Sequence, residues 1–186
     1  MARNGPSGPE PVLPKPAVSG REIAMQFVVE RLALAVHGYG IASRALDLTV
    51  AHCRDRRTFG RPLLANQVVQ HALVEMRRQV EVARAYTHAV AARHVAGELV
   101  IAEACLAKQT AVDTAAYVCD RAVQLHGGSG YMHGVEVERH YRDARILPIG
   151  GGADEVLRDL AAKLLGYTAA APPEGTAHEG TGRGSA

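Results

Sequence analysis

The chain has 186 residues, enough for one ordinary domain with a sizeable core. Hydrophobic residues make up 47% of it and aromatic residues only 4%, so alanine and leucine must do most of the packing, which favours closely packed helices over sheets. A formal net charge of +2, spread along the chain, argues against a nucleic-acid-binding face.

The composition also predicts a soluble cytoplasmic protein. No apolar run approaches the ~20 residues that cross a bilayer, and residues 1–20 hold no apolar segment of signal-peptide length. The three cysteines, Cys53, Cys105 and Cys119, lack CxxC spacing and lie within apolar helical patterns. We expect them to be buried free thiols in a reducing compartment.

The two ends of the chain have the composition of disordered tails. Residues 1–19 are rich in proline and glycine, and proline supports neither helical hydrogen bonds nor a strand ladder. Residues 168–186 are mostly Gly, Ala, Pro and Thr with scattered charge, a composition that buries too little to order itself. The folded domain is therefore expected over residues 20–167.

Three long helices are predicted within this domain. The first runs from about Gly20 to Cys53, the second from about Leu63 to Ala96, and the third from about Glu98 to His126. The second has the most regular pattern, with a strict four-three spacing at Val69, Leu73, Met76, Val80, Ala83, Thr87 and Val90. The third is expected to pack through Ile101, Cys105, Val112, Ala116, Cys119 and Val123.

Shorter elements follow the third helix. A glycine cluster at 127–130 ends it, and two short helices at about 135–144 and 153–165 flank the loop Pro148–Gly152. No segment has a convincing strand pattern. The sequence therefore predicts an all-α fold, an antiparallel up-down bundle of the four-helix type with short extra carboxy-terminal helices.

Glu30 is the polar exception on the apolar stripe of the first helix. Ile23, Phe27 and Leu34 share this stripe, so the carboxylate is predicted to be partly withdrawn from water. Desolvation brings the pKa of a carboxyl group closer to neutrality, which suits a general base. The alternative is an ion pair between Glu30 and Arg31, or another arginine, at a helix seam.

An arginine-rich turn follows the first helix. Residues 54–60 place three arginines beside Phe59 and Gly60, just before the next helix begins. Guanidinium groups and the free amide groups of a helix start together suit a phosphate. The alternative is a solvated arginine-rich corner.

A glycine run, QLHGGSGY at Gln124–Tyr131, ends the third helix. Its glycines allow the backbone to approach a ligand closely. It is not a Rossmann fingerprint, because a helix precedes the glycines and no strand is visible. Taken alone, it is a glycine-rich helix cap.

The nine histidines do not form a metal-ligand pattern. His88 and His94 are six residues apart, His133 and His140 seven, and no acidic residues complete a set of ligands. We expect surface or packing roles for the histidines and no metal.

Three motifs together resemble the carboxy-terminal domain of the acyl-CoA dehydrogenase family. They are Arg56–Gly60 with Gln67 seven residues later, Gln124–Tyr131, and Arg142–Arg145, in the order and spacing of that family. The resemblance covers about residues 27–167. It implies a four-helix-type domain that forms the core of an oligomer and binds FAD held chiefly by a neighbouring subunit.

The resemblance also implies the cofactor contacts. Arg56 would meet the FAD pyrophosphate, Phe59 would pack on the adenosine side, and Gln67 would hydrogen-bond to it. Gln124, Gly127 and Gly128 would line the same dinucleotide across the subunit interface. Thr58 and Glu155 complete the expected cofactor-binding residues.

The position of the catalytic base differs among members of the resembling family. Many family members carry it in a Tyr-Glu-Gly-Thr loop after the Arg-Asp-Ala motif, but here that loop is Gly150-Gly151-Gly152-Ala153. Ala153 also replaces a threonine that resembling enzymes use toward FAD. A minority branch, of which isovaleryl-CoA dehydrogenase is the familiar case, keeps glycines in the loop and places the base on the first helix of this domain. That position corresponds to Glu30, with Arg31 as its supporting neighbour.

The resemblance implies an FAD-dependent oxidoreductase of fatty acid metabolism. Glu30 would remove the α-proton of an acyl-CoA thioester while the β-hydrogen leaves as hydride to the flavin, giving a trans-enoyl-CoA. Enzymes of this family are about twice as long, with an amino-terminal helical domain and a middle β-domain. The expected partners are therefore a subunit supplying those domains, in a homo- or hetero-oligomer (dimer or tetramer), and an electron-accepting flavoprotein.

Three hypotheses stay open at this point. The chain is one subunit of a split dehydrogenase, an inactive truncated domain, or a helical oligomerisation module. Retention of Glu30 and Arg56 argues weakly against the last, because a scaffold needs neither.

Overall fold

A computed structural model describes residues 20–168, so both predicted tails, apart from Thr168, lie outside the described residues. The elements in chain order are α1 (Gly20–Asp55), β1 (Arg57–Thr58), β2 (Arg61–Pro62), the 3-10 turn η1 (Leu63–Ala65), α2 (Gln67–Val95), α3 (Ile101–His126), α4 (Gly128–Tyr131), α5 (Glu136–Ala144) and α6 (Asp154–Leu164). None of the helices in this part of the chain combines the length and apolarity needed to cross a bilayer.

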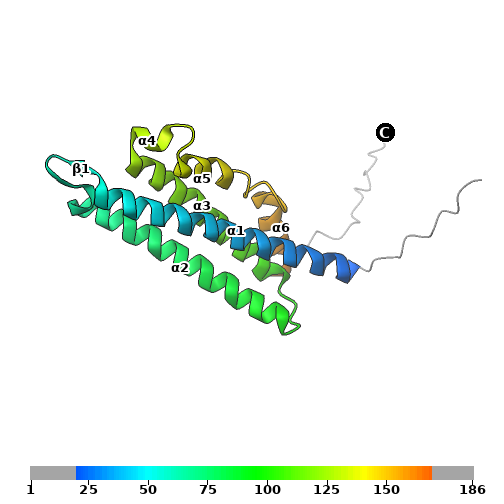
Figure 1. Ribbon diagram of the computed structural model, residues 1–186. Helices are drawn as coiled ribbons and strands as arrows, with labels where there is room; N and C mark the ends of the chain where they lie inside the picture. Colours follow the sequence, from blue (N-terminus) through cyan, green and yellow to red (C-terminus); the bar gives the residue numbers. More distant parts are fainter. Residues whose placement is uncertain (1–19, 169–186) are drawn as a thin grey trace, which may run out of the picture.

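The all-α bundle prediction is confirmed (Figure 1). The long helices α1, α2 and α3 lie side by side, with α2 antiparallel to the other two, and the short helices α5 and α6 both pack against α3. The β1–β2 hairpin and α4 are at one end of the bundle, and α6 is at the other (Figure 1). The hairpin that follows α1 and the short helix α4 that follows α3 therefore lie at the same end of the bundle.

The hairpin is an element that the sequence did not predict. Arg57 pairs with Pro62 and Thr58 with Arg61, and the two-residue turn between them has positive φ at both Phe59 (52°) and Gly60 (81°). Such a turn is usual in tight hairpins, but a phenylalanine in the left-handed region is uncommon. The sequence signal was therefore weak, because Gly60 alone has the residue type that the turn favours.

The helix faces were predicted with unequal success. All the positions expected to be buried on α2 are buried, from Val69 to Val90. On α3, Cys105, Val112 and Cys119 are buried, whereas Ala116 is exposed, so that prediction is wrong. Helix α3 is the centre of the bundle, in contact with α1, α2, α5 and α6, and it buries alanines on several sides in place of one narrow stripe.

The prediction for α1 was only partly right. Ile41, a later member of the expected apolar spacing, is buried and Leu34 packs against the core, but the first part of the stripe was placed on the wrong face. Phe27 is 46% exposed, whereas Val28, Leu32 and Ala35 are buried. The stripe that faces the core is therefore rotated away from Phe27 and Glu30. All three cysteines are buried free thiols, as predicted, and burial with the nearby Asp143 raises the pKa of Cys119 to about 12.

Candidate functional site

The predicted site residues gather in two places at opposite ends of the bundle. Glu30 lies near the start of α1 and Arg56 just after its end. Because an α-helix rises about 1.5 Å per residue, they are separated by roughly 39 Å. Within one chain, these two residues therefore belong to different sites, which we call the glycine-loop site and the Arg56 corner.

The Arg56 corner is a hollow of about 490 Å³ between the end of α1 and the end of α3. It unites two motifs that are more than sixty residues apart in the chain. The lining residues are His52, Arg56, Thr58, Leu63, Gln124, Leu125, His126, Gly127, Gly128 and Ser129. They include five of the predicted cofactor-binding residues, namely Arg56, Thr58, Gln124, Gly127 and Gly128.

The glycines of the run have different roles. Gly127 has φ +61°, and a Cβ atom added to it or to Gly128 would meet open space. A Cβ atom on Gly130 would lie 2.7 Å from the carbonyl oxygen of Val123 and 2.7 Å from Cβ of His126. Gly127 and Gly128 thus leave room for a ligand, whereas Gly130 is required by the packing of the chain against the end of α3.

A stacked histidine pair lines the same hollow. The rings of His52 and His126 are 4.2 Å apart between centroids and 24° from parallel. Burial, the neighbouring His126 and Arg56 lower the pKa of His52. Sequence reasoning missed this pair; the available signal was that His52 precedes Arg56 by one helical turn and that His126 directly precedes Gly127.

Three other predicted cofactor residues do not line this hollow. Phe59 is fully exposed at the hairpin turn, and Gln67 is exposed at the first position of α2. Glu155 is exposed in the first turn of α6, next to Asp154, which pairs with Lys108 of α3. Lys108 is eighteen residues before His126, roughly 27 Å along α3, so Glu155 belongs to the other end of the bundle.

The glycine-loop site consists of Glu30, Arg31 and the loop Gly150–Gly152. Glu30 is exposed, so the prediction that it is partly withdrawn from water is wrong, and the reason is the rotated core stripe of α1. Its position is nevertheless informative: a Cβ atom added to Gly151 would lie 3.6 Å from Oε1 of Glu30 and would overlap Cδ1 of Leu34. The carboxylate therefore lies directly beside the loop.

The loop is held by a buried lysine. Lys108 is fully buried, and its Nζ donates to the carbonyl oxygen of Gly152 (2.9 Å) and to Oδ1 of Asp154 (3.2 Å). Sequence reasoning missed Lys108; its signal was a lysine three residues after Cys105 and four before Val112, on a face predicted to be apolar.

Arg31 is the second buried cation at this end of the chain. It is 8% exposed, and its guanidinium carbon lies 5.5 Å from the ring centroid of Phe27. Its Nε has no hydrogen-bond partner among the described residues. Within the same part of the chain no ion pair joins Arg31 to Glu30, so the alternative pairing considered from the sequence is not formed there.

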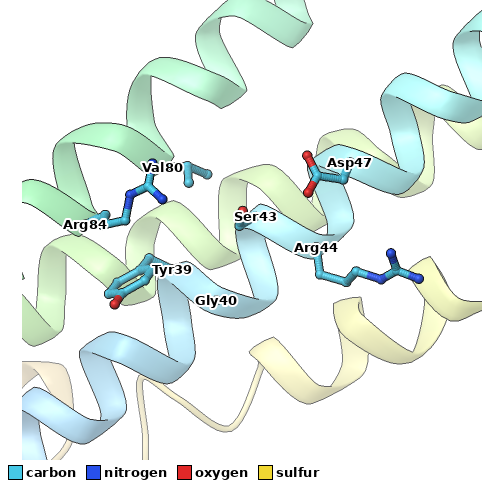
Figure 2. Close-up of a pocket in the computed structure, with 7 residues that line it drawn as sticks. All are labelled: Tyr39, Gly40, Ser43, Arg44, Asp47, Val80 and Arg84. Atoms are coloured by element: carbon cyan, nitrogen blue, oxygen red, sulfur yellow. The ribbon is translucent and has the colours of Figure 1, made fainter.

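Another hollow, of about 320 Å³, lies between α1 and α2 (Figure 2). Its charged groups already have partners: Arg44 points toward α5, where it pairs with Glu136, while Asp47 pairs with Arg77 and Arg84 with Glu81. The three charged side chains that line this hollow are therefore already paired and do not indicate a binding site for a charged ligand. Residues 20–168 also contain no group of three His, Cys, Asp or Glu side chains placed to hold a metal ion.

Comparison with known proteins gives one consistent family. The model of the acyl-CoA dehydrogenase C-terminal domain matches residues 19–166. A crystal structure assigned to the acyl-CoA dehydrogenases, from Mycobacterium smegmatis, is 55% identical, with a TM-score of 0.79 over 80% of this chain and 39% of that one. Butyryl-CoA dehydrogenase from Megasphaera elsdenii is 35% identical, with a TM-score of 0.75 over 78% of this chain and 38% of that one.

The human mitochondrial short-chain specific acyl-CoA dehydrogenase is 38% identical over 159 residues. That match covers 82% of this chain and 39% of the human protein. The chain thus spans about two fifths of the length of these relatives.

Proposed function

Because the chain belongs to the acyl-CoA dehydrogenase family and matches its carboxy-terminal domain, we propose that it supplies the helical part of an FAD-dependent acyl-CoA dehydrogenase, with Glu30 as the catalytic base. Members of this family are flavoproteins that act on CH–CH bonds. The substrate class is an acyl-CoA thioester.

One observation carries this proposal. In many family members the base belongs to the loop that reads Gly150–Ala153 here, with its carboxylate at the place of Gly151. Oε1 of Glu30 lies 3.6 Å from the Cβ position of that glycine. A carboxylate from α1 therefore lies beside the place where a loop carboxylate would start, and Leu34 fills the space that a side chain at Gly151 would need.

The chemistry assigned to the chain is a proton transfer. The carboxylate of Glu30 takes the α-proton of the thioester, and the C–H electron pair forms the new double bond as the β-hydrogen leaves as hydride. Bound FAD supplies the hydride acceptor. Since Glu30 is exposed in the described chain, the site needs covering by further domains to exclude water.

The Arg56 corner suits the diphosphate of the same cofactor class. Arg56 offers a guanidinium fork, Thr58 offers a hydroxyl donor, and Gly127 and Gly128 leave their backbone accessible. Roughly 39 Å of α1 separates this corner from Glu30, so the two ends of one chain serve different cofactor molecules in an oligomer. The partner chains supply the amino-terminal and β domains, in a dimer or a tetramer.

Oligomerisation is typical of this family, so the helical domain is expected to associate. This property of the family also supports the second candidate, a helical oligomerisation module without activity. The enzyme hypothesis requires the Glu30 carboxylate for turnover, whereas the oligomerisation module does not.

The test is a Glu30→Gln substitution in a complete enzyme. Residues 20–168 are joined to the amino-terminal and β domains of the 55% identical M. smegmatis relative, and acyl-CoA-dependent reduction of a dye is measured. Loss of the proton acceptor should lower turnover by about 10² to 10⁴. The matched control is Glu98→Gln, an exposed glutamate paired with Arg93, which should leave turnover unchanged. A decrease of less than about threefold for Glu30→Gln would remove Glu30 from the mechanism and favour the scaffold.

A further inference from the structure

The histidine stack in the Arg56 corner has a feature that the cofactor contacts above do not use. His52 comes from α1 and His126 from the last turn of α3, and both line the hollow beside Arg56. Their rings are in contact, with centroids 4.2 Å apart. Two cationic imidazoles at this distance repel each other. Once one ring of the pair has taken up an additional proton, protonation of the other ring is therefore disfavoured.

The hydrogen bonding of His126 determines what its ring can offer. Its Nδ1 lies 2.8 Å from the carbonyl oxygen of Ala122, which can only accept, so Nδ1 carries a hydrogen. In the neutral ring, Nε2 then has a lone pair and no proton. Neutral His126 therefore cannot donate from Nε2 to a phosphate oxygen, whereas protonated His126 can.

The charges around the pair favour an anion. Arg56 and the neighbouring His126 disfavour the cationic form of His52, and Asp55 opposes them with a smaller effect. From the other packed elements, η1 contributes the apolar Leu63, and α4 contributes Ser129 with the backbone of Gly128. Of the described residues that line the hollow, none is acidic, so a bound anion would be the main negative charge there.

We propose that the His52–His126 pair takes up one proton when the diphosphate of a dinucleotide binds beside Arg56. This inference rests on the proposed role of the Arg56 corner and adds a regulation to it. The bound diphosphate offsets the repulsion from Arg56, and the protonated pair gains a donor toward a phosphate oxygen. By linkage, a ligand that binds with proton uptake binds more tightly as the pH falls.

The experiment uses the full 186-residue chain and ADP-ribose at millimolar concentration as the probe. ADP-ribose carries a diphosphate diester that keeps its charge at neutral and mildly acidic pH, so any pH dependence comes from the protein. Binding is measured by NMR titration between about pH 5.5 and pH 8, where histidine changes charge, and the ring Cε1–H signals of both histidines are followed. We expect about threefold to tenfold tighter binding at the acidic end, and titration midpoints that rise when ADP-ribose is present.

Three variants separate the possible causes. His126→Phe keeps a flat ring in the stack but removes the donor toward the phosphate, so it should flatten the pH dependence, and the double variant His52→Phe with His126→Phe, which has no imidazole left to take up a proton, should abolish it. Arg56→Ala should weaken binding at every pH. His88→Gln is the matched control, because His88 lies on α2 and interacts with Tyr39, far from the hollow, and it should leave the pH dependence unchanged.

The outcomes distinguish this inference from its premise. If Arg56→Ala abolishes binding but both phenylalanine variants keep the full pH dependence, the histidine role is wrong and the Arg56 corner stands. If the wild-type chain does not bind ADP-ribose, or binds it equally well without Arg56, the corner itself is wrong and the inference fails with it. If sulfate shifts the histidine signals as much as ADP-ribose does, the site is not selective for a diphosphate and the assignment of the ligand is overturned.

Discussion

Lys108 is the residue on which the geometry of the glycine loop depends. It is fully buried, and its ammonium group satisfies both Gly152 and Asp154. Asp154 is itself buried, and Gln109 donates to its carbonyl oxygen at 3.5 Å. A buried charge of this kind is tolerated because its partner and hydrogen bonds are in place, and removal of one member leaves the other uncompensated.

We therefore predict that Lys108→Met lowers the free energy of unfolding by about 3–5 kcal/mol, because the carboxylate of Asp154 and the carbonyl of Gly152 lose their partner. Urea unfolding followed by circular dichroism measures it. The control Lys163→Met changes an exposed lysine near the end of α6 and should stay within about 0.5 kcal/mol of the wild type. In the double variant Lys108→Met with Asp154→Leu, part of the loss should be recovered; a loss below about 1 kcal/mol for Lys108→Met alone would contradict the anchoring role.

Glu30 illustrates what a residue-scale argument from sequence can miss. Its assignment to an apolar stripe was wrong, yet its position beside Gly151 agrees with the role implied by the family resemblance. Exposure in the described chain depends on what covers the helix, and a single sequence does not contain that information.

Among the elements, α1 and α3 approach each other closely at Gly38. A Cβ atom added to Gly38 of α1 would lie 3.0 Å from the carbonyl oxygen of Ala111 on α3, which is tighter than ordinary contact. Backbone cannot move aside as a flexible side chain can. Gly38 therefore determines how near α1 and α3 lie to each other. Because α5 and α6 pack on α3, the same contact also affects their distance from α1.

This contact gives a paired prediction. Gly40, two residues later, has nothing within 4 Å of an added Cβ atom, so Gly40→Ala should stabilise the chain by about 0.5–1 kcal/mol through helix propensity alone. Gly38→Ala gains the same propensity but must push α1 away from α3, and we expect it to be about 1–3 kcal/mol less stable than Gly40→Ala. Thermal unfolding of both variants tests this, and equal stabilities would show that the interface is looser than described.

At the scale of the whole molecule, the two sites face opposite ends and neither is enclosed. Exposed apolar side chains occur at both ends, with Phe27 on α1 one turn before Glu30, and Tyr131 and Met132 shortly after Gly128. This is consistent with the proposal that further domains cover both sites.

We predict that the 186-residue chain by itself binds FAD too weakly to retain it through gel filtration, because each of its two sites provides only part of a cofactor-binding surface; millimolar ligand still occupies the Arg56 corner. The purified chain should remain colourless after addition of FAD and gel filtration. Co-expression with the amino-terminal and β domains of the M. smegmatis relative should give a yellow complex, measured by flavin absorbance per chain. A stoichiometric yellow flavoprotein obtained from this chain alone would overturn the prediction.

Periodicity and residue type predicted the helices and, most completely, the buried face of α2, from Val69 to Val90. The sequence also contains the three motifs that place the chain in its family. These features are local: hydrophobic periodicity follows from 3.6 residues per turn, and glycines and prolines end helices wherever they occur. The errors, at Ala116 and on the α1 stripe, came where a helix packs against several neighbours, because the sequence pattern of one helix does not specify which of its faces each neighbour covers.

Which distant residues meet became visible only in the folded chain. The fold joined Arg56 to the glycine run, stacked His52 on His126, set Lys108 under the loop, and separated Glu30 from the Arg56 corner by the length of α1. It also formed the hairpin around Phe59, whose left-handed backbone no residue preference indicated. The physical reason is that periodicity specifies a face, whereas the partner of that face depends on how the helices cross and where each one ends.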